Sequence, residues 1–312
     1  MYFFIINPKA GNGRPKRIFN KLRKSKLYSE TESIYCYTRY KGHAEVIAHS
    51  IKESYSLVTA VIVIGGDGTL HEVINGLRNH DITVSFIPGG SGNDFARGIS
   101  NRAKPLKIVN NIVNGEKDLP YWLGNYKIDN KKSRFFINSM GFGFDAEVAQ
   151  AANASIHKKL TTLFRFGTIS YLIALIQVLL KYKPMEVTLE VNGEVRRVPN
   201  CWMVTVANHP FYGGGMKIIP SARNQPTVFP VLLIHSISKW KVLTLFMTVF
   251  TGKHVNFKEV EIIETTKLGV FSKNKVHYQV DGQTDTCNKC VITKESQSIR
   301  IAGKTTKKDT SA

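Results

Sequence analysis

The sequence has few cysteines for its length. Four of them, Cys36, Cys201, Cys287 and Cys290, occur in a chain of 312 residues. They are too few and too scattered for a disulfide framework in a chain of this size, which predicts a reducing, cytoplasmic compartment. Cys287 and Cys290 form a lone CxxC without a second pair, which favours an ordinary β-turn over a zinc or redox site.

The sequence also lacks a hydrophobic run long enough to cross a membrane. The longest run, from Phe166 to Leu180, is interrupted by polar residues and falls short of the roughly 20 residues that a span needs. The apolar stretch from Met1 to Ile6 is too short for the core of a signal peptide. It predicts a first buried strand, and we expect no transmembrane segment.

Acidic residues are scarce relative to basic ones. The chain has 23 Asp and Glu against 43 Lys and Arg, a formal net charge of +20. Residues 1–29 and 148–185 contain basic residues and no acid at all. This pattern predicts a phosphate-rich partner, either a nucleotide, anionic lipid headgroups or nucleic acid, unless the charge serves only solubility. Nucleic acid is disfavoured because the basic runs lack interleaved aromatic residues.

The first 115 residues alternate between strand-like and helix-like segments. Glycine-rich turns follow the apolar segments, a rhythm typical of a parallel sheet covered on both faces. We expect strands at 2–6, 33–38, 60–64 and 84–87, with helices at 15–24, 43–53 and 70–77.

From about Leu119 the pattern changes to many short β-rich segments. Such a density of strands predicts an antiparallel sandwich or flattened barrel. One long helix, around residues 160–182, interrupts the strands and has an apolar face at helical spacing. It either packs on its own sheet or touches a membrane as a basic amphipathic helix.

The sharpest motif is Gly65-Gly66-Asp67-Gly68-Thr69, directly after an apolar strand and before a helix. Glycines let the backbone approach a ligand closely, and the N–H groups at the start of a helix point at anions. The motif therefore predicts a phosphate-binding loop. Asp67 would act through Mg²⁺ or its waters, or would hold the loop by accepting N–H bonds.

Two further glycine-rich loops follow other predicted strands, at Asn7–Gly13 and Pro88–Arg97. The carboxyl ends of adjacent parallel strands lie side by side, so the three loops should line one crevice and form a cradle for a triphosphate. None of them fits the P-loop pattern GxxxxGK[ST], which predicts a different kind of nucleotide site.

Five segments together resemble one known family. They are INPKAG around Asn7, GGDGTLHEVINGL from Gly65, PGGSGNDFAR from Pro88, GFGFDAEVA from Gly141 and VDGQ from Val280. In this combination and order the chain resembles the bacterial diacylglycerol kinase-like lipid kinases, which are related to the sphingosine and ceramide kinases, over nearly its whole length.

The resemblance implies a fold and a domain division. It implies an N-terminal Rossmann-like α/β nucleotide-binding domain with a parallel sheet, formed by residues 1–120 and about 297–312. A C-terminal antiparallel β-sandwich of residues 121–296 would bind lipid. The last strand would return to the first domain, and ATP and lipid would meet in the cleft between the domains.

The resemblance also implies the residues of the site. Nucleotide contacts are carried over to Asn7, Pro8, Lys9, Ala10, Gly11, Thr38, Gly65, Gly66, Asp67, Gly68, Thr69, Ser91 and Asn93. The acids around Mg²⁺ and its waters would be Asp67, Asp94 and Asp118, with Arg97 pairing with this network.

Two departures from the family pattern concern activity. The family's Asp-Gly-Glu reads Asp281-Gly282-Gln283 here. Because Gln283 cannot take a proton, we predict that Asp281 is the base and that Gln283 holds Asp281 or the substrate by hydrogen bonds. The acidic turn that binds a structural Mg²⁺ in relatives has no carboxylate here between Met216 and His235, so we expect that auxiliary metal site to be missing.

The leading functional prediction is an ATP- and Mg²⁺-dependent lipid kinase that transfers the γ-phosphate to a hydroxyl of diacylglycerol or a similar lipid. Such an enzyme would be cytoplasmic and peripherally associated with the anionic inner face of the membrane. Two alternatives are a catalytically weakened regulator that binds nucleotide and lipid, and a soluble NAD-kinase-like enzyme. The sequence leaves open whether the chain forms a homodimer.

Overall fold

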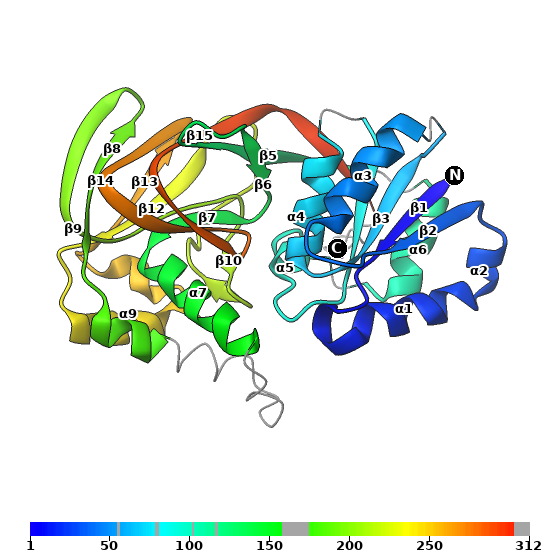
Figure 1. The fold of residues 1–312 in the computed structure, drawn as a ribbon, viewed down its shortest axis with the longest axis horizontal. Helices are drawn as coiled ribbons and strands as arrows, with labels where there is room; N and C mark the ends of the chain where they lie inside the picture. Colours follow the sequence, from blue (N-terminus) through cyan, green and yellow to red (C-terminus); the bar gives the residue numbers. More distant parts are fainter. Residues whose placement is uncertain (55–56, 79–80, 102, 116–117, 158–174, 303–312) are drawn as a thin grey trace, which may run out of the picture. The chain divides into compact units, whose positions relative to one another are not determined.

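The structure is a computed structural model that describes residues 1–312 except 55–56, 79–80, 102, 116–117, 158–174 and 303–312 (Figure 1). The chain divides into two compact units. Unit 1 contains residues 1–121 and 297–312, and unit 2 contains residues 122–296. The domain boundary expected from the sequence lies one residue away from this division.

Unit 1 is built on a parallel sheet. Its strands are β1 (Tyr2–Ile6), β2 (Ser33–Tyr37), β3 (Ala60–Gly65) and β4 (Thr83–Pro88), in the order β4-β3-β1-β2. All of these pairings are parallel. The end of the last strand, β15 (Gln283–Ala302), pairs in parallel with β4 through Ile301 and Val84. The chain therefore returns to the first unit, as the resemblance implied.

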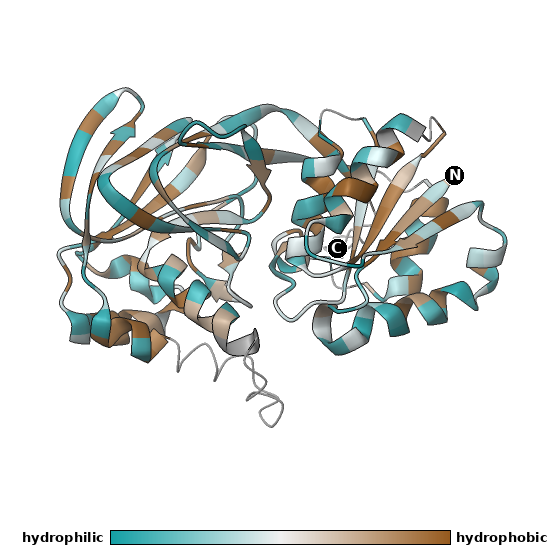
Figure 2. Ribbon diagram, viewed as in Figure 1, coloured by the Kyte–Doolittle hydropathy of each residue, from teal (hydrophilic) through white to brown (hydrophobic). Residues whose placement is uncertain are grey.

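Helices cover both faces of this sheet. They are α1 (Arg14–Arg23), α2 (Lys26–Ser29), α3 (His43–Ser54), α4 (Asp67–Gly76), α5 (Asp94–Gly98) and α6 (Pro105–Val113), with a 3₁₀ turn, η1, at Ala10–Gly13. Phe19 of α1 and Ile108 of α6 pack against Phe4 and Ile62 on one face. All six residues of β3 are buried, and Figure 2 shows the central strands as strongly hydrophobic. A strand buried on both faces has no alternation of polar residues, which is why it reads as one apolar run.

Unit 2 is an antiparallel β structure. Its larger strands are β5 (Leu119–Ile128), β6 (Arg134–Phe136), β7 (Ser139–Gly143), β8 (Met185–Val191), β9 (Glu194–Ala207), β12 (Phe229–His235), β13 (Val260–Thr265), β14 (Lys267–Val280) and most of β15. A short hairpin joins β10 (Phe211–Tyr212) to β11 (Met216–Lys217). β7 and β8 each pair with both β9 and β14, so these four strands form a closed ring around an apolar core. This agrees with the flattened barrel or sandwich expected from the sequence.

Helices pack on one side of this β structure and form a second apolar core with it. They are α7 (Phe144–His157), α9 (Lys239–Val249), a helical stretch at 175–181 and the 3₁₀ turn η2 (Lys253–Asn256). The sequence analysis did not predict α7 or α9. The expected helix at 160–182 lies outside the described residues up to 174, and its described end packs on the sandwich through Leu175, Leu179 and Tyr182. No helix among the described residues is long and apolar enough to cross a membrane.

The structure corrects the prediction for Cys287 and Cys290. Both lie within the long strand β15, not in a turn, and both side chains are buried in the sandwich core. Burial raises the pKa of the Cys287 thiol to about 12 and that of Cys290 well above its usual value. The strand register shifts beside this segment, between Phe271 and Val276 of β14. The irregular register lets two cysteines three positions apart both face inward, so they pack as neutral apolar groups.

Candidate functional site

Three glycine-rich loops meet at the carboxyl edge of the unit 1 sheet. They follow β1, β3 and β4, which are neighbours in the sheet. A Cβ atom on Gly11 would lie 2.1 Å from the Gly89 carbonyl oxygen, and one on Gly90 would lie 2.6 Å from the Gly66 Cα. No side chain fits at these contacts, so glycine is required for the loops to touch. The side-by-side arrangement expected from the sequence is present.

Asparagine side chains tie the loops down. The Asn7 amide donates to the Thr69 hydroxyl (2.9 Å) and so joins the first loop to the start of α4. Asn93 closes its own loop, because its side chain accepts from the Gly90 N–H (3.0 Å) and donates to the Gly90 carbonyl (2.9 Å). The Thr38 N–H donates to the Ile6 carbonyl (2.8 Å), which brings the end of β2 to the same edge. Lys9 and Ser91 are exposed there.

Asp67 holds the second loop against the third. Its carboxylate accepts the backbone N–H groups of Asp94 (3.2 Å) and Phe95 (2.9 Å), the first residues of α5. Of the two roles considered for Asp67, the structure shows the one of accepting N–H bonds. Asp94 in turn pairs with Arg97 across 2.9 Å, as expected, and Arg97 also donates to the Gly92 carbonyl.

Asp118 lies elsewhere, which corrects the predicted set of three acids. Its carboxylate accepts a hydrogen bond from the Thr83 hydroxyl (2.7 Å). Thr83 is the first residue of β4, whereas the loop with Asp94 follows the end of that strand. Asp118 is therefore at the opposite edge of the sheet from Asp67 and Asp94, and a sequence alone does not say at which edge a residue between α6 and β5 falls.

The geometry of this edge suits phosphate groups. α4 begins immediately after Gly66, and a Cβ atom on Gly68 would meet no atom within 4 Å. The first turn of a helix with open glycines offers N–H groups and the positive end of the helix dipole to an anion. Exposed Lys9 in the first loop and Arg14 at the start of α1 add positive charge.

Metal binding at this edge would depend on the phosphates. Among the described residues, no group of three or more His, Cys, Asp or Glu is placed to hold a metal ion. Asp67 and Asp94 bring two carboxylates together at this edge, because Asp67 accepts the Asp94 N–H. Mg²⁺ is commonly held by one or two carboxylates together with waters and phosphate oxygens, which these two side chains could provide.

In unit 2, Asp281 lies on the tight turn between β14 and β15. Asp281 and Gly282 have positive φ values of 47° and 84°, and Val280 pairs with Gln283 across the turn. Asp-Gly is a preferred sequence for such a two-residue hairpin turn, a signal that predicts this hairpin from the sequence. The Asp281 carboxylate accepts N–H groups of Ile137 (2.9 Å), Asn138 (2.8 Å) and Ser139 (3.2 Å). These amides hold Asp281 in place, which is the role that the sequence predicted for Gln283.

A buried polar network supports the segment that faces Asp281, and the sequence analysis missed it. The Asn208 amide donates to the Ile137 carbonyl (2.9 Å) and accepts from the Lys294 ammonium (2.6 Å). His209 Nε2 lies 2.8 Å from the Asn138 side-chain oxygen, and its Nδ1 accepts the Phe211 N–H. Nε2 therefore carries the proton.

Burial changes the titration of two groups in this network. It lowers the pKa of His209 to about 4, although the nearby Asp281 charge opposes the shift, so His209 is neutral near pH 7. It lowers the pKa of Lys294 to about 8. These residues come from distant strands, and no local pattern marks them as partners.

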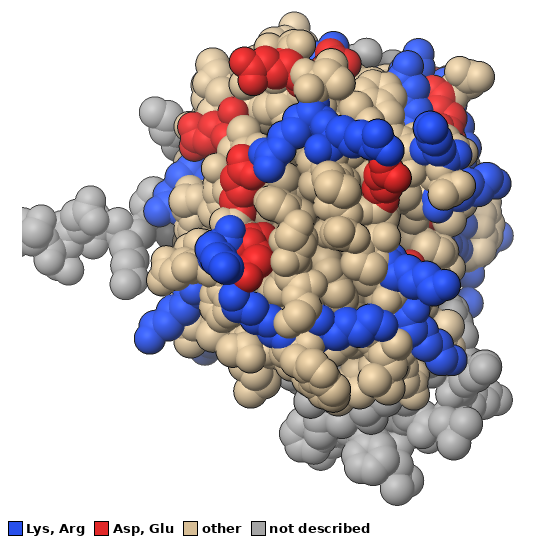
Figure 3. Space-filling model, turned by 90° about the vertical axis from the view of Figure 1, so that its left-hand side faces the viewer, with Lys and Arg blue, Asp and Glu red and all other residues tan. Residues whose placement is uncertain are grey.

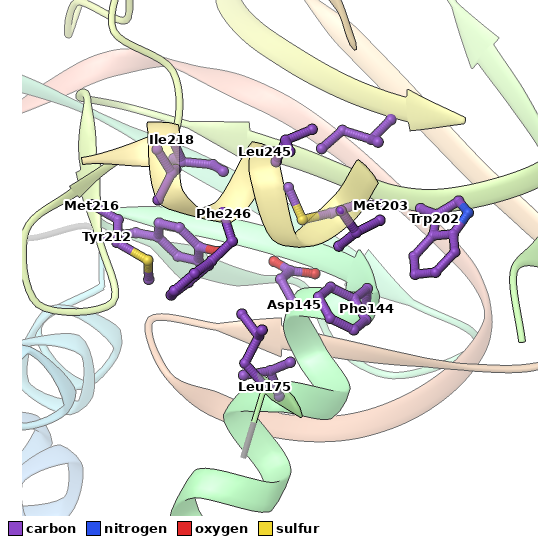
Figure 4. A pocket seen from close by; sticks show the side chains of 14 residues that line it. Phe144, Asp145, Leu175, Trp202, Met203, Tyr212, Met216, Ile218, Leu245 and Phe246 are labelled. Carbon is purple, nitrogen blue, oxygen red and sulfur yellow. The ribbon is translucent and has the colours of Figure 1, made fainter. Parts of the chain in front are cut away.

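A third feature is a small apolar pocket in unit 2 that contains a carboxyl group. Figure 4 shows Asp145, in the first turn of α7, among Phe144, Met203, Leu245 and Phe246. The cavity volume is about 40 Å³, room for about three waters at most. Asp145 is 2% exposed, and burial raises its pKa to about 7 although it accepts hydrogen bonds from Ala146 and Thr205.

Gly141 creates the space for this carboxyl group. A Cβ atom on Gly141 would lie 1.9 Å from Asp145 Oδ2. The glycine and the aspartate of the GFGFDAEVA segment are therefore packed against each other. The segment contributes to the family resemblance, but Asp145 is not among the site residues predicted from the sequence.

The segment from Pro220 to Val231, where we expect no metal site, is held by an amide. The Asn224 side chain accepts from the Trp122 N–H (2.9 Å) and donates to the Trp122 carbonyl (2.7 Å). This pair of bonds fixes the segment against β5.

Comparison with known proteins agrees with the two units. The family model described as the diacylglycerol kinase catalytic domain matches residues 1–119. The model described as the YegS C-terminal NAD kinase beta sandwich-like domain matches residues 138–302.

Individual relatives extend over almost the whole chain. The protein named "Putative lipid kinase YtlR" from Bacillus subtilis is 32% identical over 289 residues, 90% of this chain and 93% of the relative. A diacylglycerol kinase of the same organism is 26% identical over 288 residues, 89% of this chain and 88% of the relative. A solved structure described as a putative diacylglycerol kinase from Bacillus anthracis superposes with a TM-score of 0.73 at 21% identity, covering 97% of this chain and 96% of that one.

Proposed function

Since the chain belongs to the diacylglycerol kinase-like lipid kinase family, we propose that it transfers the γ-phosphate of ATP to a hydroxyl group of diacylglycerol or a similar lipid. The observation that carries this proposal is the meeting of three glycine-rich loops at one edge of the unit 1 sheet. Phosphoryl transfer needs mainly positioning and charge stabilisation, which such loops supply.

Unit 1 would hold the nucleotide. Backbone N–H groups at the start of α4 would donate to phosphate oxygens, while Gly11 and Gly90 keep the loops close enough to surround them. The Asn7–Thr69 hydrogen bond would keep the first loop in place. Mg²⁺, held by Asp67 and Asp94 through its waters together with the phosphates, would supply positive charge against that of the phosphate oxygens.

Asp281 would accept the proton of the attacking lipid hydroxyl. The new bond forms between the lipid oxygen and the γ-phosphorus, the bond from that phosphorus to the β–γ bridging oxygen breaks, and the hydroxyl proton passes to Asp281. Three backbone N–H groups hold the Asp281 carboxylate in one orientation for this step. Asn208, His209 and Lys294 would act as positioning residues through the 137–139 segment.

The apolar pocket around Asp145 would receive the end of an acyl chain. As it stands the cavity is too small for more than a methylene or two, so a chain would enter only if side chains such as Met203 and Phe246 rotate. Methionine adapts readily to such changes because it is unbranched. The lipid would be met at a membrane surface with the protein peripherally bound.

A second candidate is a protein of this fold that binds nucleotide and lipid with little turnover. This alternative is based on Gln283, which occupies the position where the family pattern has a carboxylate. The three amides on Asp281 would then serve only to shape the hairpin.

The test is transfer of labelled γ-phosphate from Mg·ATP to a panel of hydroxyl lipids in mixed micelles, with NAD as a further acceptor. We expect the wild type to label lipid, Asp281→Asn to label about 100-fold less, and Gln283→Glu to label at least as much as the wild type. A wild type that binds ATP and labels no acceptor, together with an active Gln283→Glu variant, would establish the second candidate. Label in NAD alone would contradict both.

A further inference from the structure

Exposed apolar side chains gather on one helix of unit 2 and its neighbour. Trp240 (78% exposed), Met247 (71%) and Phe250 belong to α9 or follow it, and Leu180 (67%) and Ile176 belong to the helical stretch at 175–181. They make up five of the twelve large apolar side chains that are exposed in the described chain. Lys239 Nζ donates to the Leu180 carbonyl (2.9 Å), which joins the two helices at their ends.

α9 is apolar on two opposite faces. Val242, Leu245 and Val249 are buried in the core that α9 shares with the sandwich. Trp240 and Met247 are seven residues apart, so they share one face, and that face is opposite to the buried one at 3.6 residues per turn. A helix on a protein surface normally turns polar residues outward, so a second apolar face requires a partner.

The chain in and around these two segments is strongly basic. Residues 175–185 and 236–258 contain six lysines and no Asp or Glu. Lys241 pairs with the nearest acid, Glu259, across 2.6 Å, and Lys181, Lys183, Lys239 and Lys253 are exposed. Figure 3, which looks onto this side of unit 2, shows Lys and Arg in a band across the lower part of the face and acidic residues mainly above it. The partner must therefore combine apolar material with negative charge.

A bilayer containing anionic lipid meets both requirements. Tryptophan prefers the boundary between hydrocarbon and headgroups, because its ring is apolar and its N–H is polar. Lysines around it can keep their ammonium groups among anionic headgroups while their stems lie on apolar material. An acidic protein would satisfy the lysines but leave Trp240 and Met247 without a hydrophobic environment unless it were shaped to cover them.

We propose that α9 and residues 175–181 form the surface with which this protein lies on anionic bilayers, with Trp240 and Met247 inserted at the interface. The inference deepens the proposed function, because a lipid kinase meets its substrate in a bilayer, yet vesicle binding can be measured without turnover. The inner face of α9 lines the pocket around Asp145 through Leu245 and Phe246. One helix therefore separates the proposed lipid pocket from the proposed membrane surface.

The experiment is sedimentation of the full chain with vesicles of phosphatidylcholine alone or mixed with phosphatidylglycerol. We expect binding to the mixed vesicles and little binding to the neutral ones. The tryptophan emission, to which Trp240 contributes together with Trp122 and Trp202, should shift to shorter wavelength on binding. Trp240→Ser/Met247→Ser should weaken binding more than about tenfold. Lys181→Gln/Lys183→Gln/Lys253→Gln should weaken it about 100-fold, at about fivefold for each lysine.

Matched controls separate this surface from exposed residues elsewhere. Val195 is 72% exposed on β9 and Lys107 is exposed on α6, so Val195→Ser and Lys107→Gln should bind like the wild type. All variants should melt at the wild-type temperature, because the replaced side chains are exposed. Phosphate transfer to a short-chain lipid alcohol below its micelle concentration should be unchanged in the Trp240/Met247 variant.

The outcomes distinguish the two proposals. No vesicle binding by the wild type, or binding that the Trp240/Met247 variant retains in full, would overturn the membrane surface. Binding to polyglutamate but not to vesicles would overturn it in favour of an acidic protein partner. A wild type that binds vesicles but phosphorylates no monomeric lipid would support the surface and contradict the proposed function.

Discussion

The two units present their candidate residues in different ways. In unit 1 the main groups are backbone amides, placed by loops that follow consecutive strands of one parallel sheet. In unit 2 they are side chains from distant strands, such as Asp281 with the 137–139 segment and Lys294 with Asn208. A site made of backbone depends on where glycine occurs, whereas a site made of side chains depends on strand pairing over more than 80 residues of sequence.

This difference has a consequence for mutation. Replacing Gly11 or Gly90 at the loop contacts of unit 1 introduces atoms where backbone already lies, so the damage should be large and local. Replacing a side chain in unit 2 removes one member of a network that others still support, so the damage should be graded. Four predictions test this contrast.

The largest effect is expected for Gly90→Ala. The new Cβ would lie 2.6 Å from the Gly66 Cα, so two of the three loops must separate. We expect kcat/KM for ATP to fall about 1,000-fold, or about 4 kcal/mol of transition-state stabilisation. Steady-state kinetics at varied ATP measures it. Gly115→Ala is the control for a methyl group that clashes with nothing, since a Cβ at Gly115 would meet no atom within 4 Å. Unlike Gly90, Gly115 has a positive φ of 67°, so this variant strains the backbone without a clash. Wild-type ATP kinetics in Gly90→Ala would show that the loops do not form the nucleotide site.

Asp67→Asn and Asp118→Asn form a matched pair. Asn at 67 can accept only one of the two N–H groups at the start of α5 and loses the charge proposed to lie near Mg²⁺. We expect about 30-fold lower turnover, near 2 kcal/mol, and a higher Mg²⁺ concentration for half-maximal rate. Asp118→Asn affects only the bond to Thr83 and should leave the Mg²⁺ dependence as in the wild type. Equal Mg²⁺ effects in both variants would contradict the assignment of Asp118 to the opposite edge.

Asp145 should make stability depend on pH. Because burial raises its pKa to about 7, the folded protein retains a proton that the unfolded chain loses above pH about 4. Stability should therefore fall as the pH rises from about 4 to 7 and stay level above that. Asp145→Asn is neutral throughout and should be more stable at pH 8 by about 2 kcal/mol, after the loss of one acceptor. Urea unfolding at pH 5 and pH 8 tests this, with exposed Glu30→Gln as control. An equal pH dependence in Asp145→Asn and the wild type would refute it.

The smallest effect is expected for Val148→Ile at the wall of the same pocket. One added methylene fits within a cavity of about 40 Å³ and should raise the free energy of unfolding by about 0.8 kcal/mol. If acyl chains enter this pocket, KM for long-chain lipids should rise while KM for ATP does not change. A loss of stability would mean that the pocket has no room, and then it could not admit a chain either.

Much of unit 1 follows from the sequence. The apolar run at 60–64 followed by Gly65 and Gly66 predicts a buried parallel strand and a loop at its end, and both are present. The prediction succeeds because the loop, the strand and the helix are consecutive, so local chemistry determines all three. The prediction that Asp118 lies with Asp67 and Asp94 was wrong. The position of Asp118 depends on which end of β4 the chain passes, and no local sequence pattern indicates that end.

In unit 2 the sequence predicts the class of structure but not its functional groups. The many short β segments predicted an antiparallel sandwich, while α7, α9 and the two buried cysteines of β15 were missed or misread. For α9 the reason is that its short, mainly apolar run (Lys239–Val249) suits either a helix or a strand, so periodicity does not distinguish the two.

By itself, then, the sequence determined that the chain is basic and divides into two parts. It also determined that the first part has glycine-rich loops that suit phosphate and that an Asp-Gly turn lies near the end of the chain. Only the tertiary structure decided that Asp67 binds the start of α5, that three amides hold Asp281, and that Asp145 is enclosed by apolar side chains. The physical reason is the distance along the chain over which each interaction acts. Glycine conformation and apolar periodicity act over a few residues, whereas the surroundings of a buried polar group are set by segments that meet only when the chain is folded.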